Sequence, residues 1–105
     1  MRMFRQGDVL VIATPGILPS DARARPREQG RVVLAHGEAT GHAHAISADV
    51  ATLYDARDGK VYLQVTDIPV ALLHEEHAPV EVPPGLWEVR RQREYSPAEI
   101  RTVMD

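Results

Sequence analysis

The sequence predicts an all-β protein, a small barrel or sandwich with a short C-terminal helix. Three observations lead to this expectation. The apolar runs are short and rich in β-branched residues, the segments between them are rich in glycine and proline, and helical spacing occurs only near the C-terminus. With 105 residues, the chain is expected to form a single domain, residues 1–105, around one modest core.

Six segments are expected to be strands because they are short, apolar and strong in strand propensity. They are residues 9–13, 31–35, 50–54, 60–65, 70–73 and 86–95. Asp58-Gly59 between the third and fourth segments is typical of a tight hairpin turn. We expect Trp87 in the core; it shares one face of the last segment with Val89, Arg91, Arg93 and Tyr95.

The remaining segments have other signatures. Residues 20–30 show no periodicity, which predicts an exposed loop, and the proline-rich residues 79–85 predict a turn. Ser96-Pro97-Ala98-Glu99 has the form of a capping box, and the apolar residues after it follow helical spacing. We therefore expect about two turns of helix near the C-terminus.

Composition excludes several classes of function. There is no cysteine, so a bound metal must be held by nitrogen and oxygen, and disulfides are excluded. The net charge is −3, which does not favour nucleic acid or membrane surfaces as partners. The first residues lack an apolar signal core, and no run has the length of a bilayer span, so the protein is expected to be cytoplasmic.

Four of the five histidines form two tight pairs, His42 with His44 and His74 with His77. Residues two apart on a strand share a face, so the first pair is expected to aim both rings at one point. The second pair is three apart, and a bulge or one helical turn is needed to bring its rings together. Without such an irregularity, Glu76 is the alternative ligand because it shares a face with His74.

Neutral imidazole is the commonest metal ligand among side chains, and two pairs could close one site. We therefore expect His42, His44, His74 and His77 to bind one divalent metal ion: Zn, Fe, Mn or Ni. Four ligands would make a closed structural site, whereas three would leave a position for water or a small-molecule substrate. Glu75 and Glu76 are candidate general bases beside a metal-bound water. His36 and Glu38 are candidates for supporting contacts or a further ligand.

Part of this pattern resembles the cupins, which are small β-barrels. Gly37, followed five residues later by His42-Ala43-His44, is similar to the opening of the cupin metal motif. The resemblance implies a cupin-like barrel whose last ligand is a histidine on a later strand. The spacing is one residue short, Asp49 is the only acidic residue soon after the pair, and Pro83-Pro84-Gly85 follows the second pair instead of preceding it.

A second resemblance spans nearly the whole chain. Four motifs resemble those of a group of small uncharacterised bacterial and phage proteins: Gln6-Gly7-Asp8, residues 37–44 with their Gly-His-Ala-His end, His74-Glu75-Glu76-His77, and residues 92–95. This likeness implies a distinct family, and it brings no established activity with it.

Two other hypotheses compete with the metal site. One is a non-enzymatic accessory module that binds a protein or RNA partner through arginines, which can clamp phosphate or carboxylate. The arginines concerned are Arg23, Arg25 and Arg27 in the expected loop and Arg90 and Arg91 on the last strand. The other is a pH or metal sensor built on the histidines. The oligomeric state is left open, a homodimer included.

Overall fold

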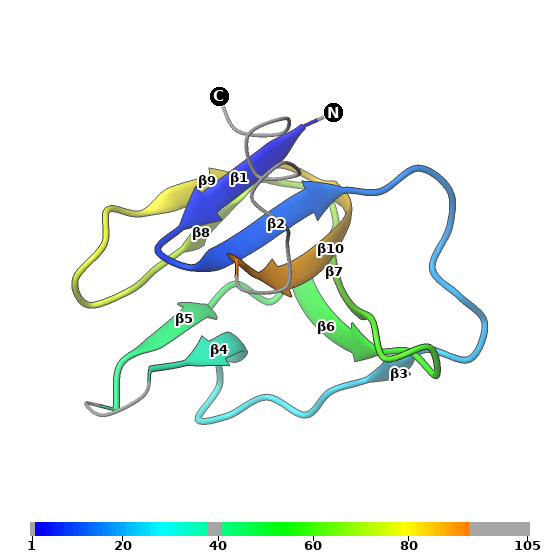
Figure 1. The fold of residues 1–105 in the computed structure, drawn as a ribbon, viewed down its shortest axis with the longest axis horizontal. Coiled ribbons are helices and arrows are strands. Elements are labelled where there is room, and N and C mark those ends of the chain that lie inside the picture. The colour runs from blue at the N-terminus through cyan, green and yellow to red at the C-terminus, as the bar shows by residue number, and fades with distance from the viewer. Residues whose placement is uncertain (1, 38–40, 93–105) are drawn as a thin grey trace.

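The computed structural model describes residues 2–37 and 41–92, and these residues form ten β-strands (Figure 1). The strands are β1 (Met3–Gln6), β2 (Val9–Ala13), β3 (Arg23–Ala24), β4 (Val32–His36), β5 (Ala43–Ile46), β6 (Ala51–Asp55), β7 (Val61–Val65), β8 (Val70–Leu72), β9 (Val80–Val82) and β10 (Gly85–Arg91). The described residues contain no α-helix, and none of them forms a helix able to cross a membrane.

Six strands form one antiparallel sheet in the order β1-β2-β10-β7-β6-β3. The chain enters at one edge with β1, and β10 returns to lie between β2 and β7. Trp87 on β10 therefore faces Ala13 on one side and Leu63 on the other. Within the sheet, β2 from the start of the described chain therefore pairs with β10 from its end.

Two hairpins, β4–β5 and β8–β9, complete the structure. Both lie on the same side of the molecule, where β1 and β2 turn (left in Figure 1). The β4–β5 register shifts between Val33 and Ala35, which is a β-bulge. A pair of backbone hydrogen bonds between Ala45 and Leu73 connects the two hairpins.

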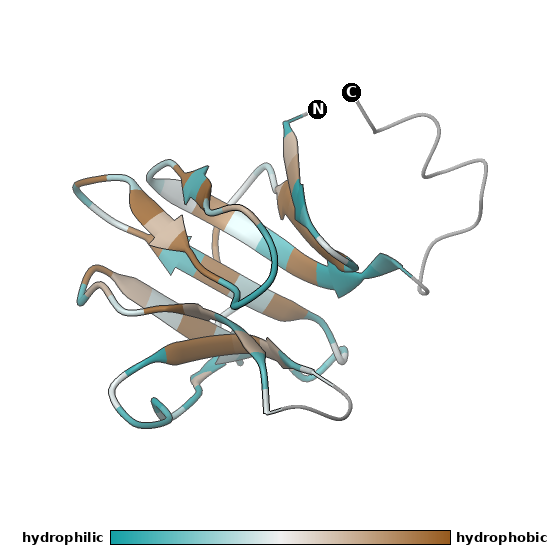
Figure 2. Ribbon diagram, turned by 90° about the vertical axis from the view of Figure 1, so that its left-hand side faces the viewer, coloured by the Kyte–Doolittle hydropathy of each residue, from teal (hydrophilic) through white to brown (hydrophobic). Residues whose placement is uncertain are grey.

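The core lies between the large sheet and the hairpins. Aliphatic residues from the sheet, such as Val11, Leu53 and Leu63, pack with Ile46 and Leu72 from the hairpins. In Figure 2 the brown, hydrophobic bands lie mainly on the strands, which also carry teal, hydrophilic bands. Trp87 is 2% exposed within this core, as expected from the sequence.

The strand predictions are largely confirmed, since β2, β4, β6, β7, β8 and β10 all begin within a residue of the expected segments. The Asp58-Gly59 turn also joins β6 to β7 as expected. Of the other four strands, β5 agrees with the strand assumed for the His42 and His44 pair, and β1, β3 and β9 were missed. Residues 20–30 were expected to be a loop but contain β3, and residues 79–85 were expected to be a turn but contain β9. β1 was missed because residues 3–6 show no alternation of apolar and polar side chains.

The all-β class is confirmed, but the expected barrel is wrong. The six-stranded sheet does not close, because its edges β1 and β3 do not pair with each other. The two-residue length of β3 and the proline-containing segment before it leave too few backbone groups for such a pairing. The structure therefore gives no cupin-like barrel. The expected C-terminal helix lies outside the described residues.

Replacing Leu63 by alanine tests this account of the core. Leu63 is fully buried at the centre of the sheet, so Leu63→Ala should lower the free energy of unfolding by about 2–5 kcal/mol. Urea denaturation followed by tryptophan fluorescence measures the change. Ile68→Ala is the control, because Ile68 is 57% exposed and its loss should cost no more than about 0.5 kcal/mol. Equal costs for the two variants would contradict the assigned core.

Candidate metal centre

The two histidine pairs meet because β5 and the end of β8 are hydrogen-bonded to each other. The amide of Ala45 donates to the carbonyl of Leu73 at 3.0 Å, and the amide of Leu73 donates back at 2.9 Å. In this antiparallel pairing, the next residues in register are His44 and His74. Cross-strand neighbours of this kind have side chains in contact.

All four imidazole rings lie in one cluster, which we call the histidine cluster (His42, His44, His74 and His77). The ring centroids of His44 and His74 are 4.3 Å apart, and those of His74 and His77 are 4.7 Å apart. His42 lies edge-on to His74 at 5.6 Å, and His44 stacks with His77 at 5.9 Å. His44 is buried, His42 and His74 are partly exposed, and His77 is exposed.

The second pair converges because the chain bends at residues 75–77 instead of continuing as a strand. The amide of Glu76 donates to Nδ1 of His74 at 3.0 Å and closes this bend. The neutral ring of His74 therefore has its proton on Nε2. A metal ion bound at Nδ1 would replace this hydrogen bond, and one bound at Nε2 would require the ring proton to move to Nδ1, which would also end the bond from Glu76.

Glu75 adds a carboxylate to the cluster. Its Oε1 accepts a hydrogen bond from the amide of Ala43 at 3.0 Å. This bond, together with one to its own amide and with the nearby His42 and His74, lowers the pKa of the Glu75 carboxyl below its ordinary value. Ligand atoms of His42, His74 and Glu75 lie within 4.8 Å of one another. Glu76 places Oε1 3.8 Å from Nδ1 of His42.

Gln6 holds the buried histidine in place. Its side chain is 2% exposed and makes three hydrogen bonds. Nε2 donates to the carbonyls of Leu72 at 2.8 Å and Ala78 at 3.0 Å, and Oε1 lies 2.9 Å from Nδ1 of His44. A single amide thus connects β1, β5 and both ends of the bend.

The β1–β2 turn closes one side of the cluster. Gly7 has φ +60°, and a Cβ placed there would lie 2.7 Å from Nε2 of His77 and 3.3 Å from Cε1 of His44. Only glycine permits both this backbone conformation and this close approach. Asp8 follows, with Oδ1 3.8 Å from Nε2 of His44 and Oδ2 bound by Arg91.

The surroundings of His44 favour the neutral ring. Burial, which penalises the charged form, lowers its pKa from 6.5 to about 4, and His74, His77 and Arg91 act in the same direction. Asp8 acts in the opposite direction. At neutral pH the ring therefore has a lone pair available to a metal ion.

His36, which was expected as a supporting residue or a further ligand, lies away from the cluster. His36 is exposed and pairs with Glu28, with 3.0 Å between Nε2 and Oε1. Glu38 lies outside the described residues. Sequence reasoning missed Gln6, Gly7 and Asp8 as parts of the site. Their only signal was that they form one of the motifs of the second resemblance.

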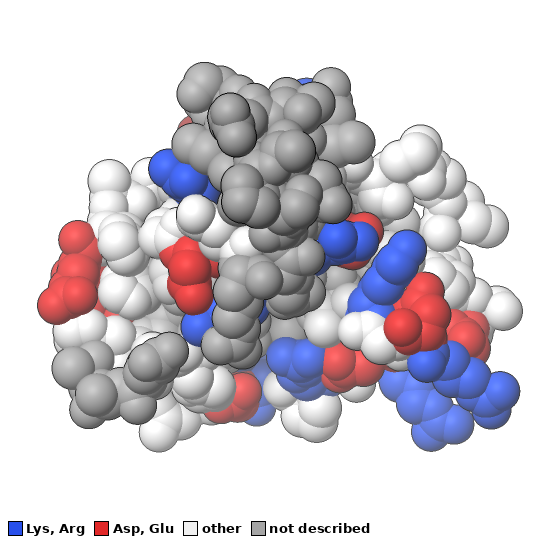
Figure 3. Space-filling view, viewed as in Figure 1, with Lys and Arg blue, Asp and Glu red and all other residues white. Residues whose placement is uncertain are grey.

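The arginines of the alternative hypothesis mostly contact groups of the protein itself. Arg25 makes a double hydrogen bond with Asp55, which raises the pKa of Arg25 and lowers that of Asp55. Arg27 donates to three backbone carbonyls, and Arg90 pairs with Glu88. In Figure 3, blue and red side chains alternate over β3 and the β6–β7 turn. This surface is therefore mixed in charge.

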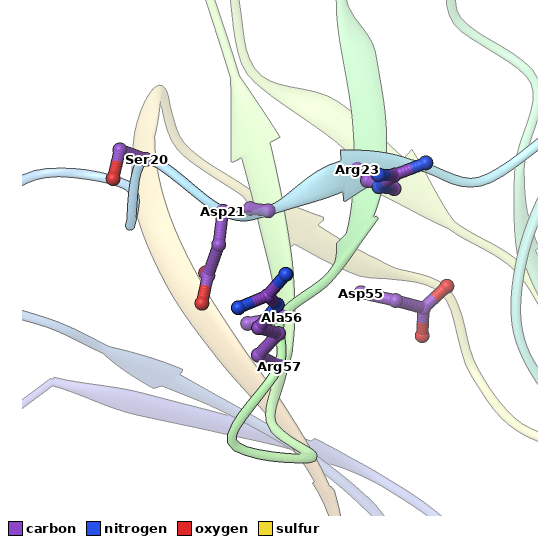
Figure 4. Close-up of a pocket in the computed structure, with 7 residues that line it drawn as sticks. Ser20, Asp21, Arg23, Asp55, Ala56 and Arg57 are labelled. Atoms are coloured by element: carbon purple, nitrogen blue, oxygen red, sulfur yellow. The ribbon is translucent and has the colours of Figure 1, made fainter.

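A hollow with a volume of about 370 Å³ lies beside β3, away from the histidine cluster (Figure 4). It is lined by Ser20, Asp21, Ala22, Arg23, Asp55, Ala56 and Arg57. Two arginines and two aspartates give its lining no net formal charge. The hollow offers no preference for an anion or a cation.

The comparison with known families fits these motifs. A family model described as a domain of unknown function (DUF8820) matches residues 5–92. The chain belongs to this family. The match contains the whole histidine cluster together with Gln6, Gly7, Asp8 and Arg91. No curated protein and no solved structure matches the chain. This membership agrees with the expectation of a distinct family that has no established activity. The bacterial or phage origin of the family stays a prediction.

Replacing Gly7 by alanine tests the packing of the turn against the histidines. Gly7→Ala should strain the backbone at φ +60° and displace His77, because the new Cβ would overlap its ring. Gly30→Ala is the matched control, since Gly30 has φ +78° and nothing within 4 Å. The control should cost about 1–2 kcal/mol of unfolding free energy, and Gly7→Ala should cost more. Only Gly7→Ala should shift the imidazole NMR signals; shifts of equal size in both variants would argue against the contact.

The lowered pKa of His44 predicts a pH-dependent stability of the metal-free protein. As pH falls from 6.5 to about 4, the unfolded chain takes up a proton that the folded chain does not. The free energy of unfolding should have its full value above pH 6.5 and should be lower by up to about 3 kcal/mol at pH 4. Urea denaturation across this range measures the fall. It should be smaller in His44→Gln and unchanged in His36→Gln; identical pH profiles for wild type and His44→Gln would refute the assignment.

Proposed function

We propose that the protein binds a divalent transition-metal ion through the histidine cluster, with His42, His44, His74 and His77 as nitrogen ligands. The observation that supports this most is the gathering of four rings, from two segments about thirty residues apart, at centroid separations of 4.3–5.9 Å. Glu75 adds an oxygen donor within 4.8 Å of the ligand atoms of His42 and His74. Such a set of donors suits Zn, Fe, Mn or Ni.

A metal ion also accounts for the electrostatics of the cluster. Burial disfavours protonation of His44, and the neighbouring His74 and His77 disfavour it further. A bound cation would be attracted to the lone pairs of these neutral ring nitrogens. Nδ1 of His44 has a hydrogen-bond partner in Oε1 of Gln6 at 2.9 Å, whereas its Nε2 lies 3.8 Å from Oδ1 of Asp8, beyond hydrogen-bond distance.

The ion would have access to solvent, because His77, Glu75 and Glu76 are exposed. If all four histidines bind, a water molecule or a small-molecule substrate would be a fifth ligand; if one ring stays unbound, water or substrate would take the open position. A bound divalent ion lowers the pKa of its water, and Glu75 or Glu76 is placed to accept the proton. The alternative function, binding of an RNA or protein partner through arginines, has less support because Arg25, Arg27, Arg90 and Arg91 contact groups of the chain itself.

Titration of chelator-treated protein with Co²⁺ tests the proposal. The absorption bands of Co²⁺ report its ligands, and wild-type protein should bind with a defined stoichiometry. His42→Ala and His74→Ala should each weaken binding by roughly tenfold or more. His36→Ala is the matched control, because His36 pairs with Glu28 on the surface, and it should bind as wild type does. Absence of saturable binding, or an equal loss in His36→Ala, would exclude the proposed site.

A further inference from the structure

The hydrogen bonds of Gln6 determine which nitrogen of His44 carries its proton. Both hydrogens of the Gln6 amide nitrogen are donated, one to the carbonyl of Leu72 and one to that of Ala78. These two bonds fix the orientation of the amide, so that its oxygen, which can only accept, lies 2.9 Å from Nδ1 of His44. The proton of the neutral ring lies on Nδ1, and Nε2 presents a lone pair.

That lone pair faces a carboxylate. Oδ1 of Asp8 lies 3.8 Å from Nε2 of His44, which is too long for a hydrogen bond. Two electron-rich atoms then face each other with no proton between them, an arrangement that is repulsive unless a cation lies there. Zinc binds nitrogen at about 2.0–2.1 Å and oxygen at about 2.0–2.2 Å, so a nitrogen and an oxygen ligand of one ion lie at most about 4.3 Å apart. The observed separation falls within this limit.

Asp8 is also held in this orientation from the other side. Arg91 on β10 binds Oδ2 through Nε at 3.0 Å and through a terminal nitrogen at 2.9 Å. Both contacts engage the same oxygen and leave Oδ1 directed toward His44. Gly7 immediately before it brings the turn against the cluster.

The geometry points to Asp8 as an oxygen ligand of the metal ion, paired across it with Nε2 of His44, and to Gln6 as the positioning residue that directs this nitrogen to the ion. This inference rests on the proposed metal-binding function. It adds a ligand from the β1–β2 turn, a third segment of the chain, to those from the two histidine pairs.

Comparison of Asp8→Asn with Asp55→Asn tests the assignment. Each substitution removes one negative charge and one arginine pair, but only Asp8 faces the cluster. With Co²⁺ and Zn²⁺ titrated into the chelator-treated full chain, Asp8→Asn should lower the affinity by roughly tenfold or more and alter the Co²⁺ spectrum. Asp55→Asn should leave both unchanged.

Two NMR measurements on the wild-type protein keep the test independent of whether the variant folds. The ¹⁵N shifts of metal-free His44 should show a protonated Nδ1 and an unprotonated Nε2, and the ¹³C carboxyl signal of Asp8 should move when Zn²⁺ is added. The opposite tautomer, an unmoved carboxyl signal, or unchanged Co²⁺ binding by Asp8→Asn would overturn the role of Asp8 while wild-type binding upholds the metal site. A wild-type protein that binds no metal would overturn both.

Discussion

The two hydrogen bonds between Ala45 and Leu73 set the register on which the site depends. They place His44 opposite His74, and the bend that follows His74 brings Glu76 near His42. A shift of one residue would turn the side chains of one strand to the opposite face. The rings would then no longer meet. The core fixes this register, because Ile46 and Leu72 beside the bridge are both fully buried.

Gln6 makes the arrangement specific in a way that apolar packing cannot. A buried amide is costly unless its donors and its acceptor are satisfied, and here all of them have partners. Because those partners are the carbonyls at both ends of the bend and the ring of His44, any movement of the bend leaves a polar group unsatisfied. The orientation of a ring on β5 is thereby coupled to the backbone between β8 and β9.

The strands and turns that could be predicted from the sequence are those that depend on local patterns. Aliphatic runs such as 9–13 predicted strands, and Asp58-Gly59 predicted its hairpin, because period and turn chemistry are local properties. β9 could not be anticipated, since its three residues lie among prolines and pair with β8 only through the tertiary structure. The histidines were visible as candidates because imidazole has few ordinary structural uses. Gln6 and Asp8 were not, because their roles depend on residues 38 and 36 positions away.

The burial of the donors varies across the cluster, and this variation has a consequence for how an ion would enter. On one side, His44 and Gln6 are buried and Asp8 is held by Arg91, so these groups keep their orientation before any ion arrives. On the other side, His77 and Glu75 lie exposed on the bend, and His74 must change its hydrogen bond to bind an ion. The fixed side would set which ion fits, and the bend would adjust to it. A substrate or water would therefore reach the ion from the bend, because the β1–β2 turn closes the opposite approach.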